Sequence, residues 1–205
     1  MHLLTLTRGG ATKQRERLGL SIEEMGVVRE REMRQMESQL GLTSLVVLDL
    51  PDGGLVDLDP RLIERAIAKR VEETRPDVMV TYAYHGNSLH PDHLVTHAVV
   101  KRVYCVVRAL TGGPRRLALF TLVEGEMAGA AGHLRGEPAE RIGARIRYTP
   151  ADRTVAAAAL AQYATYASQI ASHDPLSLVD QSGVAFVLFD ESVPPEPLDD
   201  LTDGL

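Results

Sequence analysis

Short apolar runs alternate with longer amphipathic stretches along most of the chain. The apolar runs predict strands over residues 2–7, 45–50, 78–82, 117–122, 145–149 and 184–189. The intervening stretches predict helices over residues 22–40, 60–75, 91–111 and 152–171. Strands that alternate with helices predict a parallel sheet covered on both faces. The expected fold is therefore α/β, a Rossmann-like three-layer αβα arrangement with a mostly parallel sheet.

Local signals mark where the predicted helices begin. Ser21 followed by Glu24 is a capping-box pattern, and Pro60 and Pro91 suit the first position of a helix. Asp152 is the predicted N-cap of the alanine-rich helix. These signals fix helix starts more closely than the apolar pattern alone.

The length of 205 residues predicts one domain over residues 1–205. Residues 123–143 are rich in glycine, alanine and glutamate, which favours a mobile loop whose function stays open. Residues 193–205 are acidic and proline-rich and predict a flexible tail.

Charge and cysteine content narrow the classes of partner. The net charge of -6 disfavours nucleic acid and anionic membrane, so a small-molecule partner is expected and a homo-oligomer stays open. The single cysteine, Cys105, lies in an apolar run and is expected to be buried. With no apolar segment long enough to cross a membrane, the chain reads as cytoplasmic.

The stretch SLHPDHLVTH follows the predicted strand 78–82, where ligands of open α/β sheets bind. His90 and His93 are three residues apart at a helix start with Asp92 between them, which suits a zinc ligand beside a proton-transfer group. The simpler alternative is that His90 and Asp92 cap the helix and His93 is partly exposed. His97 is either a further ligand or a packing residue.

A catalytic zinc usually has three protein ligands and a water. The stretch supplies one or two, and the chain contains no C-x-x-C or H-E-x-x-H motif. The G-x-S-x-G motif of Ser-His-Asp hydrolases and the phosphate-binding loop motifs are absent from the sequence as well. The glycine pairs at 9–10 and 53–54 are therefore interpreted as tight turns. The sequence motifs therefore supply fewer than the three protein ligands that a catalytic zinc site needs.

Five motifs in order carry a family resemblance. TLTRGGATKQ, VREREMRQMESQLGL, LDLPDGGL, RPDVMVTY and LHPDH, over roughly residues 2–110, closely resemble the LmbE-like (PIG-L) N-acetylglucosaminyl deacetylase superfamily, with a weaker echo in YASQ at 166–169. The resemblance implies a zinc hydrolase that removes acetyl groups from N-acetylglucosaminyl compounds, including precursors of mycothiol and bacillithiol.

The resemblance also implies roles for individual residues. His93 would be a zinc ligand, His90 would stabilise the tetrahedral intermediate or pass a proton, and Asp92 would support His90. Arg29 and Asp52 would hold sugar hydroxyls.

The family's A-H-P-D-D-E motif, which supplies a histidine and an aspartate to zinc and a second aspartate as general base, does not occur in this sequence. We therefore expect an N-terminally truncated form of the domain, with a start placed downstream of that motif and with activity in doubt. Two alternatives stay open. One is an inactive member that serves as a binding or assembly module, and the other is an amidase that acts on thiol conjugates.

Overall fold

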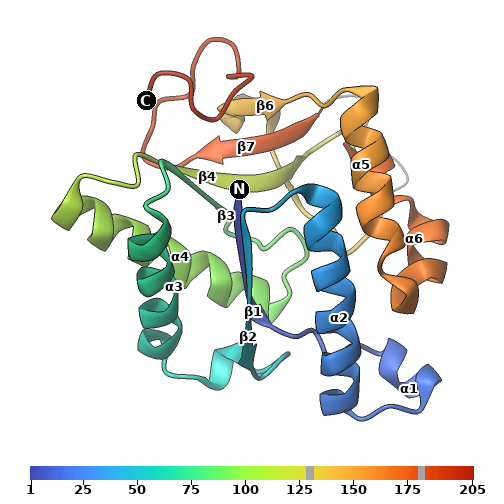
Figure 1. Ribbon diagram of the computed structural model, residues 1–205. Helices are drawn as coiled ribbons and strands as arrows, with labels where there is room; N and C mark the ends of the chain where they lie inside the picture. The colour runs from blue at the N-terminus through green and yellow to red at the C-terminus, as the bar shows by residue number, and fades with distance from the viewer. Residues whose placement is uncertain (128–131, 180–182) are drawn as a thin grey trace. The chain divides into compact units, whose positions relative to one another are not determined.

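The computed structural model describes residues 1–127, 132–179 and 183–205 (Figure 1). The chain divides into two compact units, residues 1–57 with 148–177 and residues 58–147 with 178–205. Each unit is described by itself. The single domain over residues 1–205 stays a prediction.

The first unit combines a two-stranded parallel sheet with helices. Strands β1 and β2 pair in parallel, with Leu3 opposite Leu45, and α2 packs against both β2 and α5. The unit consists of β1 (His2–Thr7), α1 (Gln14–Leu18), α2 (Ile22–Leu40), β2 (Ser44–Leu50), η1 (Leu55–Asp57), α5 (Pro150–Ala161), η3 (Ala164–Tyr166) and α6 (Ala167–His173), and η4 (Pro175–Leu178) crosses its boundary.

The predicted capping box of α2 is confirmed. The Glu24 N–H donates to the Ser21 hydroxyl at 3.2 Å, and the Ser21 N–H donates to the Glu24 carboxylate at 2.9 Å. This reciprocal cap satisfies two helix-terminal donors and fixes where α2 begins. Helix α1, in contrast, was not predicted, because its five residues lie in a basic stretch with no apolar periodicity.

The second unit contains a mixed sheet in the strand order β3-β4-β7-β6, with β5 paired to the end of β4. Helices α3 and α4 pack against each other, and α4 also packs against β3 (Figure 1). The unit consists of α3 (Pro60–Thr74), β3 (Val78–Tyr82), α4 (Pro91–Thr111), β4 (Arg116–Val123), β5 (Gly136–Glu137), η2 (Ala139–Arg141), β6 (Ala144–Ile146) and β7 (Val184–Leu188).

The α/β class is confirmed, but the prediction of a mostly parallel sheet is wrong for this unit. Strand β3 runs parallel to β4, whereas β7 runs antiparallel to both β4 and β6. The helices between β6 and β7 belong to the first unit. The alternation of strands and helices along the chain therefore did not determine the direction of β7, because an antiparallel neighbour needs no crossover helix packed on the same sheet.

Two further predictions fail in detail. The predicted helix over residues 152–171 is broken into α5, η3 and α6, and its N-cap is Thr149, with Asp152 three residues on as the partner in a capping box. Cys105 was expected to be buried and is exposed, because it occupies an outward position of α4.

Two composition-defined segments have described contacts. The predicted loop over residues 123–143 contains β5 and η2, and residues 128–131 of it lie outside the described residues. In the stretch 193–205, the Leu198 N–H donates to the Gly143 carbonyl at 3.0 Å, and Leu198 and Leu201 pack against the apolar cluster around Phe186. The flexibility of this tail stays a prediction. Within the part of the chain that the structure describes, no helix has the length and apolar character needed to cross a membrane.

Candidate functional site

The loop between β3 and α4 carries most of the candidate chemistry. It is a compact turn in which the Leu89 N–H donates to the His85 carbonyl at 2.9 Å. Gly86, Asn87 and Leu89 have positive φ angles of 60°, 57° and 57°. These left-handed residues fold the chain back so that the Gly86 carbonyl faces the first turn of α4.

His93 is held by this loop from one side. Its Nδ1 lies 2.9 Å from the Gly86 carbonyl oxygen, and its ring stacks on Tyr82 with centroids 4.2 Å apart and an interplanar angle of 9°. A carbonyl only accepts, so Nδ1 carries the proton, and the neutral ring leaves its lone pair on Nε2. A backbone carbonyl often orients a metal-binding histidine in this way.

Gly86 is required for this arrangement. A Cβ atom at this position would lie 2.5 Å from the His93 Cβ, and the φ of +60° independently disfavours other residues. The glycine therefore allows the close approach that joins the loop to His93.

His90 lies beside His93. It is the N-cap of α4, where its Nδ1 accepts a hydrogen bond of 3.3 Å from the Asp92 N–H, and the two histidine rings have centroids 5.1 Å apart. The neutral His90 ring therefore carries its proton on Nε2. Asp92 is buried and also accepts from the Thr96 hydroxyl through its carbonyl at 2.7 Å. The structure thus brings His90, Asp92 and His93 together in one turn.

His97 is oriented differently from His93, four residues earlier. Its Nδ1 donates to the Tyr82 carbonyl at 2.8 Å, and only 7% of the residue is exposed. Burial lowers the pKa of His97, although the Tyr82 carbonyl acts in the opposite direction. These contacts support the packing alternative for His97.

The described residues do not by themselves make a zinc site. Within residues 1–127, 132–179 and 183–205, no group of three or more His, Cys, Asp or Glu side chains is arranged to hold a metal ion. The role of His93 as a zinc ligand stays a prediction.

Arg29 lies in the first unit, at the centre of a partly buried cluster. Its Nη1 donates to Glu32 at 2.9 Å and to the Thr165 hydroxyl at 3.2 Å. Its guanidinium group lies 4.4 Å from the centre of the Tyr163 ring and 4.5 Å from that of Tyr166. Glu32 also accepts from the Thr165 N–H and hydroxyl, both at 2.8 Å. We call these five residues the Arg29 cluster.

The partners of Arg29 outside α2 were missed by sequence reasoning. Thr165 follows Glu32 by 133 positions, so no local pattern joins them. The one available signal was the weak family echo that begins at Tyr166.

Asp52 is engaged on both carboxylate oxygens. It accepts from the Thr7 hydroxyl at 2.8 Å and from the Ala11 N–H at 2.7 Å. Asp52 therefore ties the turn after β2 to the chain that follows β1.

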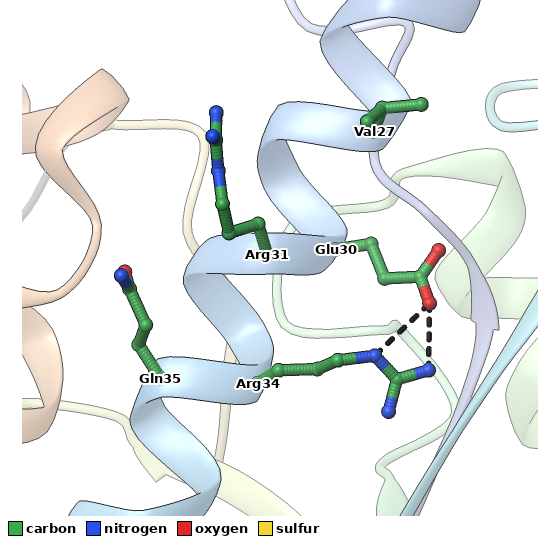
Figure 2. A pocket seen from close by; sticks show the side chains of 5 residues that line it. All are labelled: Val27, Glu30, Arg31, Arg34 and Gln35. Carbon is green, nitrogen blue, oxygen red and sulfur yellow. Dashed lines mark hydrogen bonds and ion pairs between the residues drawn. The ribbon is translucent and has the colours of Figure 1, made fainter.

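A pocket of about 390 Å³ lies on α2 (Figure 2). Glu30 and Arg34 form an ion pair at its edge, with Arg34 Nη2 2.6 Å from the Glu30 carboxylate. The lining residues are Val27, Glu30, Arg31, Arg34 and Gln35, none of which is a candidate site residue.

These features define an α/β protein with a histidine pair at a helix start after a strand. Residues 1–104 match the family model PIG-L, described as GlcNAc-PI de-N-acetylase. The chain belongs to the PIG-L family, as its motifs predict.

The relatives that match parts of the chain are named as deacetylases. The chain is 29% identical over 85 residues to a probable N-acetyl-alpha-D-glucosaminyl L-malate deacetylase 2 of Bacillus anthracis, covering 42% of the chain and 37% of the relative. It is 35% identical over 78 residues to a 1D-myo-inositol 2-acetamido-2-deoxy-alpha-D-glucopyranoside deacetylase of Nakamurella multipartita, covering 33% and 27%. The chain thus matches about a third of the length of these curated relatives.

The fold has solved counterparts. The A40926 pseudoaglycone deacetylase Dbv21 superposes with a TM-score of 0.63 at 20% identity, covering 92% of this chain and 83% of that one. At this identity the likeness establishes the fold alone.

Proposed function

We propose that the protein is a zinc-dependent N-deacetylase that hydrolyses the acetamide of an N-acetylglucosaminyl-type substrate. The observation that carries this proposal is the geometry of His93. Its Nδ1 is committed to the Gly86 carbonyl, and its Nε2 is left as a ligand atom beside His90. Membership of the PIG-L family gives this geometry its chemical context.

His93 is proposed as a zinc ligand through Nε2. The described residues supply this one position, so zinc dependence rests on the family resemblance and on the His93 tautomer. The Rossmann-like three-layer arrangement and the cytoplasmic location belong to the same proposal and rest on the sequence.

His90 is proposed as the group that stabilises the oxyanion or passes the proton. Amide hydrolysis adds water to the carbonyl carbon, breaks the C–N bond and places a proton on the departing amine. A neutral His90 carries its proton on Nε2, which can donate to the carbonyl oxygen as negative charge develops there. Asp92, buried beside it, is proposed to support the His90 ring.

Arg29 and Asp52 are proposed to bind sugar hydroxyls. The Arg29 Nε is buried and has no hydrogen-bond partner among the described residues, so this guanidinium retains a donor. The Asp52 oxygens each accept one hydrogen bond and retain lone pairs for another. Hydroxyl groups are the chemistry that such a donor and acceptor pair would recognise.

The substrate class is tested by acetate release by the protein in the presence of zinc. The panel would contain N-acetylglucosaminyl L-malate, the N-acetylglucosaminyl inositol, free N-acetylglucosamine and an N-acylated thiol conjugate. We expect release from at least one of the first three compounds. Release from the thiol conjugate alone would contradict the amino-sugar assignment and favour the amidase alternative.

Matched variants connect the activity to the proposed site. His93→Ala should abolish acetate release, whereas His133→Ala, which replaces an exposed histidine, should leave it unchanged. Full activity in His93→Ala would refute the proposed role of His93.

A second candidate is a binding module without catalysis, favoured by the lack of a three-ligand group among the described residues. It predicts that calorimetry detects binding of the amino sugar while zinc produces no acetate. Acetate release that disappears with His93→Ala excludes this candidate.

A further inference from the structure

A second polar group in the second unit is not used by the proposed function. It consists of His85 in the loop after β3, Asn87 two residues later, and Glu137 in β5. The three residues are 4%, 8% and 2% exposed. We call them the His85 cluster.

The His85 cluster holds three buried atoms without a hydrogen-bond partner among the described residues. They are the Nε2 of His85 and both the Nδ2 and Oδ1 of Asn87. A buried donor or acceptor that lacks a hydrogen-bond partner destabilises the folded state. Three such atoms on two residues of one loop therefore point to a bound group.

The protonation of His85 is fixed by the backbone. The Asn87 N–H donates to His85 Nδ1 at 3.0 Å, so the proton of the neutral ring lies on Nε2. Burial lowers the pKa of His85, and the nearby His97, Arg135 and Arg141 add to this effect. His85 is therefore neutral near pH 7 and presents an N–H donor.

Glu137 presents an acceptor to the same space. One of its carboxylate oxygens accepts from Arg141 Nη1 at 2.9 Å, and the other lies 3.9 Å from His85 Nε2. A separation of 3.9 Å is too long for a direct hydrogen bond. It is short enough for one oxygen atom to accept from His85 and donate to Glu137.

We propose that the His85 cluster is a binding site for one neutral hydroxyl group, which accepts from His85 Nε2–H and donates to the Glu137 carboxylate. Asn87, two residues from His85, has a buried side-chain amide whose donor and acceptor atoms are also without a partner among the described residues. Arg141 balances the charge of Glu137, so an ion would find no free counter-charge here. The hydroxyl comes from an ordered water or from an alcohol group of a sugar or polyol.

Nitrogen-15 NMR of the full chain tests this site. Long-range proton–nitrogen correlations should show the His85 ring proton on Nε2 at pH 7. With water as the occupant, Nε2–H gives a cross-relaxation peak to a bound water that added sugar does not change. With an alcohol as the occupant, titration with myo-inositol or N-acetylglucosamine shifts Nε2–H saturably.

Two results would overturn the site. One is a His85 ring protonated on Nδ1 or on both nitrogens at pH 7. The other is a protonated Nε2 that shows neither a water peak nor a sugar-dependent shift.

Variants that conserve size provide a second check. Glu137→Gln keeps an acceptor for Arg141 but turns a donor toward His85, so the bound hydroxyl loses the acceptor for its own proton, and the water peak or the sugar shift should weaken. Asn87→Gly keeps the backbone N–H to His85 and tolerates the φ of +57°, so the Nε2 tautomer should persist. An unchanged signal in a folded Glu137→Gln protein contradicts the proposal, and if Glu137→Gln does not fold, the wild-type spectra alone decide.

Discussion

The first turn of α4 and the Arg29 cluster on α2 both contain charged or polar side chains that sequence motifs assign to function, yet they use those side chains differently. In the α4 turn, each histidine uses Nδ1 within the protein, and Nε2 is the atom for which we propose a chemical role. In the Arg29 cluster, most polar atoms of Arg29 and Glu32 are engaged with Thr165 and with each other. The two regions therefore differ in how many polar atoms of their motif residues are engaged within the protein, and in the Arg29 cluster the Arg29 Nε is the exception.

The largest expected effect is the loss of stability when the Arg29 cluster is broken. Glu32→Ala should lower the free energy of unfolding by about 3–5 kcal/mol, because it leaves a buried arginine without its carboxylate. Only 7% of the Glu32 side chain and 16% of the Arg29 side chain are exposed. Chemical denaturation measures the change.

The matched control lies on the same helix. Arg34→Ala breaks the Glu30–Arg34 pair, whose arginine side chain is 51% exposed, and should cost less than about 1 kcal/mol. Equal losses in Glu32→Ala and Arg34→Ala would show that the Arg29 cluster is not a structural element.

The proposed catalytic role of the first turn of α4 is tested by substitutions of His90. His90→Ala should lower the rate of acetate release by about 10²–10⁴-fold, the usual contribution of a general acid or base, and should leave bound zinc unchanged. His90→Asn retains an N-cap acceptor and so separates the capping contribution of about 1 kcal/mol from catalysis. Equal activity in His90→Asn and the wild type would assign His90 to capping alone.

A smaller effect is expected when the support of His93 is disturbed. Gly86→Ala should weaken zinc affinity by about 10–100-fold, because the new methyl group displaces His93 from the Gly86 carbonyl. Gly112→Ala is the control, since Gly112 also has a positive φ, of +81°, but a Cβ there meets no atom within 4 Å. Similar zinc affinity in both variants would contradict the role of the Gly86 carbonyl.

The smallest effect concerns the pH dependence of stability. Burial holds the pKa of His97 below its usual value of about 6.5, so the unfolded chain takes up the proton first as the pH falls. The stability that His97 contributes is therefore complete above about pH 6.5 and is lost below it.

His97→Asn removes this titration. The variant should lose less unfolding free energy between pH 7 and pH 5 than the wild type, although His85, whose pKa is also lowered, continues to contribute. A steeper pH dependence in His97→Asn would contradict the assigned direction.

Local signals account for the parts of the fold that the sequence predicted. Ser21 with Glu24, Pro60 and Pro91 act within one helical turn, and the helices begin at the residues that these signals mark. The antiparallel pairing of β7 was not predictable in this way, because strand direction depends on partners far along the chain.

In the candidate site, too, local features were predictable from the sequence and long-range contacts were not. The closeness of His90 and His93 follows from their spacing of three on one helix. The different environments of His93 and His97 do not, because they depend on the Gly86 and Tyr82 carbonyls of the preceding loop and strand. Their roles in metal binding and catalysis stay predictions.

The most direct test of the central claim is a zinc titration followed by long-range proton–nitrogen NMR of the histidine rings. The arrangement around His93 predicts a proton on Nδ1 and a zinc-dependent shift at Nε2, while the buried His97 should not respond. A His93 ring protonated on Nε2 would contradict the claim that this residue is a metal ligand. So would zinc-dependent shifts at other histidines without any shift at His93.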